Sequence, residues 1–193
     1  MRAPNDKKFR ELILFIAEKS EGDRPFGATK LNKLLFRSDF AAYLMFGNAI
    51  TWHRYQALGN GPAPRALLPI LEKMEKTREI AFAERNFYGR PQRRVIALRA
   101  PDLSLFSAAE IDLVTTIIEE CWGKTATRMS QLSHEFIGWK LAENGEDIPY
   151  EVALIDERAP TPKEIEKGIQ FQKLAQKALE GYETSEAKSH ARG

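Results

Sequence analysis

The chain has 193 residues, which is enough for one domain with a hydrophobic core and a terminal extension. Its 29 Lys and Arg nearly balance 27 Asp and Glu, and this small net charge of +2 argues against nucleic acid as the main ligand. Cys121 is the single cysteine, which excludes an internal disulfide. Neither a signal-peptide pattern nor a run of about 20 apolar residues is present, so we expect a cytoplasmic protein with no membrane partner.

Two amphipathic helices are predicted at the start of the chain. The first is expected over residues 5–19, where Asn5 or Asp6 can cap the first turn and apolar residues recur at helical spacing. The second and longer one is expected over residues 28–46. Gly47 is placed to end it in the left-handed conformation, which side-chain-bearing residues resist.

The next segment changes from helical to extended character. Residues 52–58 contain aromatic side chains and predict a short strand, which is followed by a turn at residues 59–62. A third helix is expected to begin near Pro62 or Pro64, because proline suits a first helical turn. Pro69 lies inside the apolar pattern of this helix and is expected to kink or divide it.

A β-hairpin with a basic tip is predicted from two extended segments, residues 79–86 and 93–100. Arg90, Arg93 and Arg94 lie near its tip, and helices followed by a basic hairpin are the layout of a winged helix. The alternative function is therefore a DNA-binding transcription regulator that uses these arginines. The small net charge favours the simpler interpretation, in which the arginines keep an exposed hairpin soluble, so nucleic acid is not the expected partner.

Two helices are expected after the hairpin. Ser107 and Glu110 form a capping box, in which each side chain satisfies a backbone amide near the other, and Gly123 ends the helix that follows. A shorter helix is expected over residues 127–136, and a short apolar stretch ends near Ile155.

The sequence as a whole predicts the α+β class, with one mostly helical domain, a small antiparallel β-sheet or hairpin, and a C-terminal helix. We expect the domain to cover residues 5–158. An amphipathic helix with a narrow apolar stripe is expected over residues 159–181, and the small polar residues 182–193 predict a disordered tail.

The sequence lacks the common catalytic and metal-binding patterns. His134 and Glu135 begin like a helical zinc motif, but position 138 is Gly, so the second histidine is missing. Cys121 lies on the apolar side of its helix, which favours a small buried hydrophobe over a nucleophile paired with His53 or His134. We therefore expect a protein that is not an enzyme, with no catalytic residue, no metal site and no cofactor.

Five short motifs carry a family resemblance. They are KLNKLLFRSD over residues 30–39, YQALGNGP over 55–62, LSHE over 132–135, WK at 139–140 and IPY over 148–150. In this order they resemble the Panacea domain of SocA-like antitoxins, over roughly residues 9–155. The family pattern separates its serine and histidine by two residues, whereas His134 directly follows Ser133 here.

The resemblance implies an antitoxin of a bacterial toxin–antitoxin system. Such a protein neutralises a toxin encoded in the adjacent gene by direct protein–protein binding, and SocA-like members can also present the toxin to a cytoplasmic protease. Polar residues on the first motif helix are expected to face the partner, whereas a structural role is the alternative for the histidine and tryptophan of the later motifs. The candidate partner-binding residues are Lys30, Lys33, Arg37, Asp39, Tyr55, His134 and Trp139.

Overall fold

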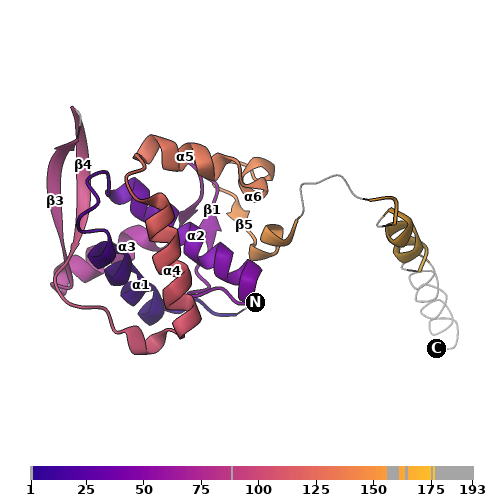
Figure 1. The fold of residues 1–193 in the computed structure, drawn as a ribbon, viewed down its shortest axis with the longest axis horizontal. Coiled ribbons are helices and arrows are strands. Elements are labelled where there is room, and N and C mark those ends of the chain that lie inside the picture. Colours follow the sequence, from indigo (N-terminus) through magenta and orange to yellow (C-terminus); the bar gives the residue numbers. More distant parts are fainter. Residues whose placement is uncertain (1, 88, 156–160, 164, 175, 177–193) are drawn as a thin grey trace, which may run out of the picture. The chain divides into compact units, whose positions relative to one another are not determined.

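The computed structural model describes residues 2–87, 89–155, 161–163, 165–174 and 176. The chain divides into two units, residues 1–155 and 156–193, which are described separately. The first unit is mostly helical and carries two small antiparallel sheets in its described part (Figure 1). This confirms the predicted α+β class.

Helices α1 (Asp6–Lys19) and α2 (Ala28–Phe46) form the centre of the first unit. The side chain of Asn5 caps α1 by accepting a hydrogen bond from the Lys8 amide at 2.9 Å. Gly47 ends α2 with a φ of 69°, in the left-handed region. Both helices therefore have the predicted extents and termini.

The other helical elements surround these two. They are α3 (Leu67–Lys76), η1 (Leu103–Leu105), α4 (Ala108–Cys121), α5 (Ala126–His134), α6 (Ile137–Leu141) and η2 (Tyr150–Leu154). The predicted capping box at the start of α4 is confirmed, because the Ser107 and Glu110 side chains each bond to the other residue's backbone amide.

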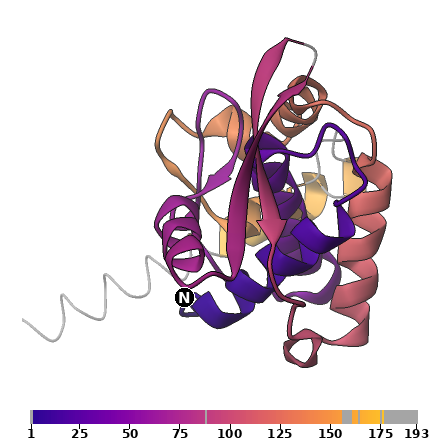
Figure 2. The same ribbon diagram turned by 90° about the vertical axis from the view of Figure 1, so that its left-hand side faces the viewer.

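The strands form two separate sheets. Strands β1 (Tyr55–Gln56), β2 (Ala63–Pro64) and β5 (Asp147–Ile148) pair in the antiparallel order β2-β1-β5. Strands β3 (Ile80–Phe87) and β4 (Arg90–Ala97) form the predicted hairpin, in register from Ile80 opposite Ala97 to Phe87 opposite Arg90. The hairpin stands at one side of the unit (Figure 1), and its strands extend past the neighbouring helices (Figure 2).

The predicted strand over residues 52–58 is wrong in length, because only Tyr55–Gln56 pair. Trp52 adopts a φ of 59°, and a residue in this left-handed region interrupts an extended strand. The expected start of the third helix at Pro62 or Pro64 is also wrong. Pro64 lies in β2, and the helix begins at Leu67.

Pro69 does not divide α3, which runs without interruption from Leu67 to Lys76. With the helix beginning at Leu67, Pro69 is its third residue. Amides in the first turn have no intrahelical acceptor, so a proline there removes no helical hydrogen bond.

Helix α2 separates two cores. The larger core is mostly aliphatic and joins α1, α3, α4 and the hairpin, with Leu12 and Leu34 among its fully buried side chains. The second core is aromatic and lies between α2 and the segment near η2, where Phe40 contacts Tyr55 and Tyr150 with ring centroids 5.4 and 4.7 Å away. Since α2 contributes to both, its polar side chains have little access to solvent.

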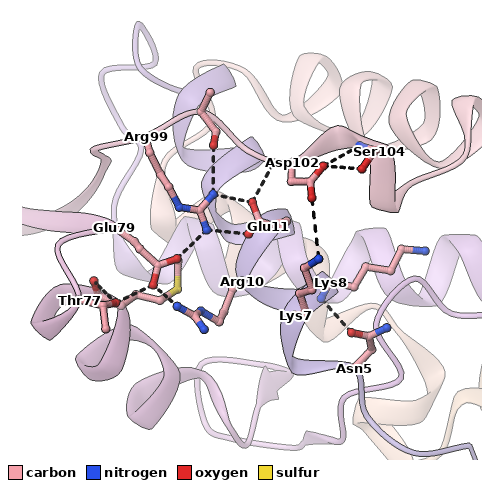
Figure 3. Close-up of polar contacts among 12 residues, drawn as sticks. Asn5, Lys7, Lys8, Arg10, Glu11, Thr77, Glu79, Arg99, Asp102 and Ser104 are labelled. Atoms are coloured by element: carbon pink, nitrogen blue, oxygen red, sulfur yellow. Dashed lines mark hydrogen bonds and ion pairs between the residues drawn. The ribbon is translucent and has the colours of Figure 1, made fainter.

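Two buried carboxylates tie the base of the hairpin to α1 (Figure 3). The Arg99 guanidinium donates to Glu11 Oε1 and Glu79 Oε2, each at 2.6 Å. Glu79 also pairs with Arg10, and the Asp102 amide donates to Glu11 Oε2 at 2.8 Å. The network joins α1, both ends of the hairpin and the loop that leads to α4.

We expect this network to make stability depend on pH. The hydrogen bond from Arg99 lowers the pKa of Glu11. Burial acts to raise the pKa of Glu79, but hydrogen bonds from Thr77, Arg99 and Arg10 lower it overall. Because both folded-state pKa values lie below the ordinary value of 4.5, the stabilisation is present above that pH and is lost as the pH falls through the lowered values.

Arg99→Ala should therefore lower the free energy of unfolding by about 2 kcal/mol at neutral pH, and the difference from wild type should shrink in acid. Urea unfolding at about pH 7 and about pH 3 measures both values. Lys7→Ala is the control, because Lys7 makes only an exposed contact with Asp102 at 3.9 Å. A difference between Arg99→Ala and wild type that stays constant with pH would contradict this account.

In the second unit, residues 162–163, 165–174 and 176 are helical. A helix turns by about 100° per residue, so Ile165 and Ile169 share one side while Phe171 and Leu174 share the opposite side. The described part of the helix thus carries apolar residues on two sides, and the predicted narrow apolar stripe over residues 159–181 stays a prediction. The expected helix end at Gly181 and the tail over residues 182–193 lie outside the described residues.

Candidate functional site

The first motif residue, Lys30, lies in the interior with 1% of its surface exposed. Its ammonium donates to Asp23 Oδ2 at 2.5 Å, to the Cys121 carbonyl at 2.6 Å and to the Lys124 carbonyl at 3.0 Å. All three donor positions of the ammonium are thus used. Lys30 joins the start of α2 to the loop before it and to the end of α4.

Arg94 of strand β4 reinforces the same junction. Its buried guanidinium donates to the carbonyls of Ser20 and Asp23 at 2.7 and 3.0 Å, and also to that of Glu21. This candidate for nucleic-acid contact is therefore turned inward and fixes the hairpin to the loop after α1. Three carbonyls of this loop point to one side, and a planar guanidinium can donate to several acceptors at once.

The two other arginines of the hairpin differ from Arg94. Arg93 is exposed, and its guanidinium lies 3.5 Å from the centre of the Phe82 ring in a cation–π contact. The side chain of Arg90 lies outside the described residues. Of the three predicted nucleic-acid contacts, Arg93 is thus the one that the structure places at the surface.

Three residues from three different motifs meet around Gly61. The Lys33 ammonium donates to the Pro62 carbonyl at 2.9 Å, and burial lowers the pKa of Lys33 to about 8. Gly61 has a φ of 95°, and a Cβ atom there would lie 2.1 Å from Ser133 Oγ and 2.8 Å from Lys33 Nζ. The glycine is required both by its backbone conformation and by this close approach.

Asp39 is fully buried and holds the segment before β1 against α2. It accepts hydrogen bonds from the Thr51 amide at 2.7 Å, the Thr51 hydroxyl at 2.5 Å and the Tyr55 hydroxyl at 2.8 Å. Burial raises the pKa of Asp39 and that of Tyr55. Asp39 therefore acts as an internal acceptor for a chain segment that follows α2.

The expectation that polar residues of the first motif helix face a partner is wrong for Lys30, Lys33 and Asp39, which are buried, and Tyr55 is buried with them. Each satisfies polar groups of a loop packed on α2. Arg37 is the exception, because its side chain is 37% exposed and pairs with Glu120 at 3.1 Å at the surface.

His134 and Trp139 form a partly exposed stack where α5 meets α6. Their rings are 3.9 Å apart with an angle of 13° between their planes. The Trp139 indole donates to the Leu58 carbonyl at 2.9 Å and so holds the turn after β1. His134 Nε2 is buried and has no hydrogen-bond partner in the described part of the chain. Of the seven candidate partner-binding residues, Arg37, His134 and Trp139 are the ones that reach the surface.

The described residues offer little for catalysis. Cys121 is buried in the larger core, and burial raises the pKa of its thiol, which disfavours the nucleophilic thiolate. No cluster of three or more His, Cys, Asp or Glu in this part of the chain is arranged to hold a metal ion. No helix in the same residues is both long enough and apolar enough to span a bilayer.

Comparison with known proteins identifies a family. The family model described as antitoxin SocA-like, Panacea domain, matches residues 31–140, which is more than half of the chain. The chain belongs to this family. The matched region contains Asp39, Gly61, His134 and Trp139, and the family resemblance is confirmed. Lys30 and the motif over residues 148–150 lie outside the match. No curated protein and no solved structure matches the chain.

Proposed function

We propose that this SocA-like chain is an antitoxin that neutralises a toxin protein encoded in the adjacent gene by direct, stoichiometric binding. The family match over residues 31–140 is the observation that carries the proposal. The polar motif residues support binding over catalysis, since Lys30 and Asp39 have internal partners that build the fold. Such a scaffold is suited to presenting a fixed surface to a protein partner.

Growth of cells that express the adjacent reading frame tests the proposal. Expression of that frame alone should arrest growth, and co-expression of this chain should restore it. A neighbour that is harmless, or one that stays toxic beside this chain, would count against the antitoxin function.

Delivery of the toxin to a cytoplasmic protease is a second route to neutralisation that the family implies. The toxin's half-life, measured with and without this chain, separates the two routes. An unchanged half-life with restored growth supports occlusion by binding, whereas a shortened half-life supports an adaptor role.

The buried Arg94 counts against the alternative of a transcription regulator that uses the hairpin.

The helical second unit is expected to contribute to toxin affinity, because its described part exposes four large apolar side chains: Ile165, Ile169, Phe171 and Leu174. Such residues gain free energy when a partner covers them. Deleting all residues after Ala159 should weaken toxin binding by about tenfold, which corresponds to about 1.4 kcal/mol. Isothermal titration calorimetry measures the affinity. The shortened chain should still unfold in urea with the transition that the first unit shows within the full chain. A toxin affinity that the deletion leaves unchanged would remove this role for the second unit.

A further inference from the structure

Strand β3 leaves one edge of the hairpin sheet open. Among the described residues it pairs with β4 alone, and Figure 1 shows it at the margin of the unit. An open strand edge is a template for pairing with another strand. We infer that this edge pairs with β3 of a second copy of the chain, so that two hairpins join into one antiparallel sheet. This self-association does not depend on the toxin.

The register of the hairpin decides which backbone groups face the open edge. The Leu98 amide donates to the Glu79 carbonyl at 2.8 Å, and these two residues continue the register of β3 and β4 by one pair. Every second residue of an antiparallel strand bonds to the facing strand, so Phe82 and Glu84 direct their amide and carbonyl groups away from β4. Within the described chain these groups have no hydrogen-bond partner.

The opposite edge of the hairpin is covered by the chain itself. The same alternation turns the amide and carbonyl of Arg93 away from β3. A Cβ atom on Gly27 would lie 3.3 Å from the Arg93 carbonyl oxygen and 2.8 Å from Gln92 Cγ, so the loop before α2 lies against this edge. Arg94 fixes β4 to the same loop. The sheet is therefore extended at β3 rather than at β4.

The side chains of β3 favour one register for two copies related by a two-fold axis. An axis at Glu84 or at Arg85 would set identical charges directly opposite each other, which destabilises a sheet. An axis at Phe82 would set the charged Glu84 opposite Ile80, which is buried at the foot of the strand. An axis at Ala83 sets Phe82 of each copy opposite Glu84 of the other and places a small residue on the axis. We assign this last register.

The axis at Ala83 also brings opposite charges together. The Arg93 guanidinium lies 3.5 Å from the centre of the Phe82 ring, on the face of the hairpin that carries Glu84. Its contact with Glu84 of its own chain is long, at 3.9 Å, and the two side chains are 50% and 70% exposed. Directly opposite residues have Cβ atoms about 5 Å apart, so Glu84 of the second copy reaches the Arg93 that covers Phe82. The two-fold axis repeats this contact, and a second copy of β3 therefore complements the edge in shape of backbone and in charge.

The test exchanges the two charges in separate chains. Glu84→Arg sets cations against each other across the axis, and Arg93→Glu sets anions against each other. Each variant alone should weaken self-association by about tenfold or more. An equimolar mixture of the two variants should associate again, because each chain supplies the charge that the other lacks. Glu119→Arg is the control, since it makes the same change of charge at an exposed position of α4.

Sedimentation equilibrium of the full chain measures the dimer dissociation constant at low ionic strength and at concentrations up to about 500 µM, because a single strand pairing belongs to the weak class of interfaces. Glu119→Arg and the mixture should stay within about threefold of wild type. A wild-type chain that remains monomeric would overturn the inference. So would a mixture that associates no better than its two components, or dimers that persist in every variant.

A second pair of variants tests the backbone. Glu84→Pro removes an amide that faces the open edge, while the bonds of the hairpin itself use the alternate residues. Glu84→Thr keeps that amide and lacks only the charge. Glu84→Pro should associate at least about tenfold more weakly than Glu84→Thr, and equal association of the two would overturn pairing along this edge. Circular dichroism checks that both variants are folded, and the mixture of charge variants decides the inference if Glu84→Pro is not.

Discussion

Replacing Lys30 with Ala is expected to lower the free energy of unfolding by about 4 kcal/mol. The substitution removes the ammonium from a site where the Asp23 carboxylate is equally buried, with side-chain exposures of 1% and 2%. It also leaves the carbonyls of Cys121 and Lys124 without this donor. An uncompensated buried charge costs far more than the pair itself contributes, and this is why the expected loss is large. Urea unfolding followed by circular dichroism measures it.

Arg37→Ala is the matched control on the same helix. Arg37 also pairs with a carboxylate, that of Glu120, but both side chains are substantially exposed. Its loss should cost at most about 1 kcal/mol. If Lys30→Ala and Arg37→Ala proved equally stable, the assignment of Lys30 to the interior would be wrong. Lys30 would then return as a candidate for direct contact with the toxin.

Gly61→Ala is expected to destabilise the fold by about 3 kcal/mol, the sum of a left-handed backbone penalty and a steric overlap. The added methyl group would overlap Ser133 Oγ and approach Lys33 Nζ. The overlap would push the turn after β1 away from α2 and α5, and so would disturb the surface near the His134–Trp139 stack. Thermal unfolding and urea unfolding both report the loss.

Gly47→Ala separates the two contributions. Gly47 is also left-handed, with a φ of 69°, but a Cβ atom there meets nothing within 4 Å. Its replacement should cost only about 1 kcal/mol. Adding Ser133→Ala to Gly61→Ala should recover part of the loss, because it removes the overlapping hydroxyl. Equal effects at the two glycines would show that the backbone penalty alone accounts for Gly61.

Local structure was largely predictable because its causes are local. Asn5 caps α1, Gly47 ends α2, and the Ser107–Glu110 box starts α4, each through contacts within four residues in the sequence. The hairpin followed from two extended segments around a short turn. Pro69 was misjudged only because the start of α3 was placed too early. This shows that the effect of a proline depends on its position in the helix.

The burial of the motif residues could not be predicted in the same way, because their partners are distant in the sequence and are mostly backbone atoms. Lys30 meets the carbonyl of Cys121, and Lys33 meets that of Pro62. One signal was available: apolar residues lie on every side of α2, which is typical of a helix buried all round. A lysine on such a helix is expected to be internal and paired.

Titration of the purified toxin's activity with the purified full-length chain tests the central claim, stoichiometric neutralisation by binding, most directly. With toxin concentrations well above the dissociation constant, the activity should fall linearly and reach zero near one equivalent of the chain. A complex of the two proteins should elute together on size-exclusion chromatography. Full activity in the presence of excess chain would contradict the account, and so would complete inactivation by a small fraction of an equivalent, because turnover would then identify an enzyme.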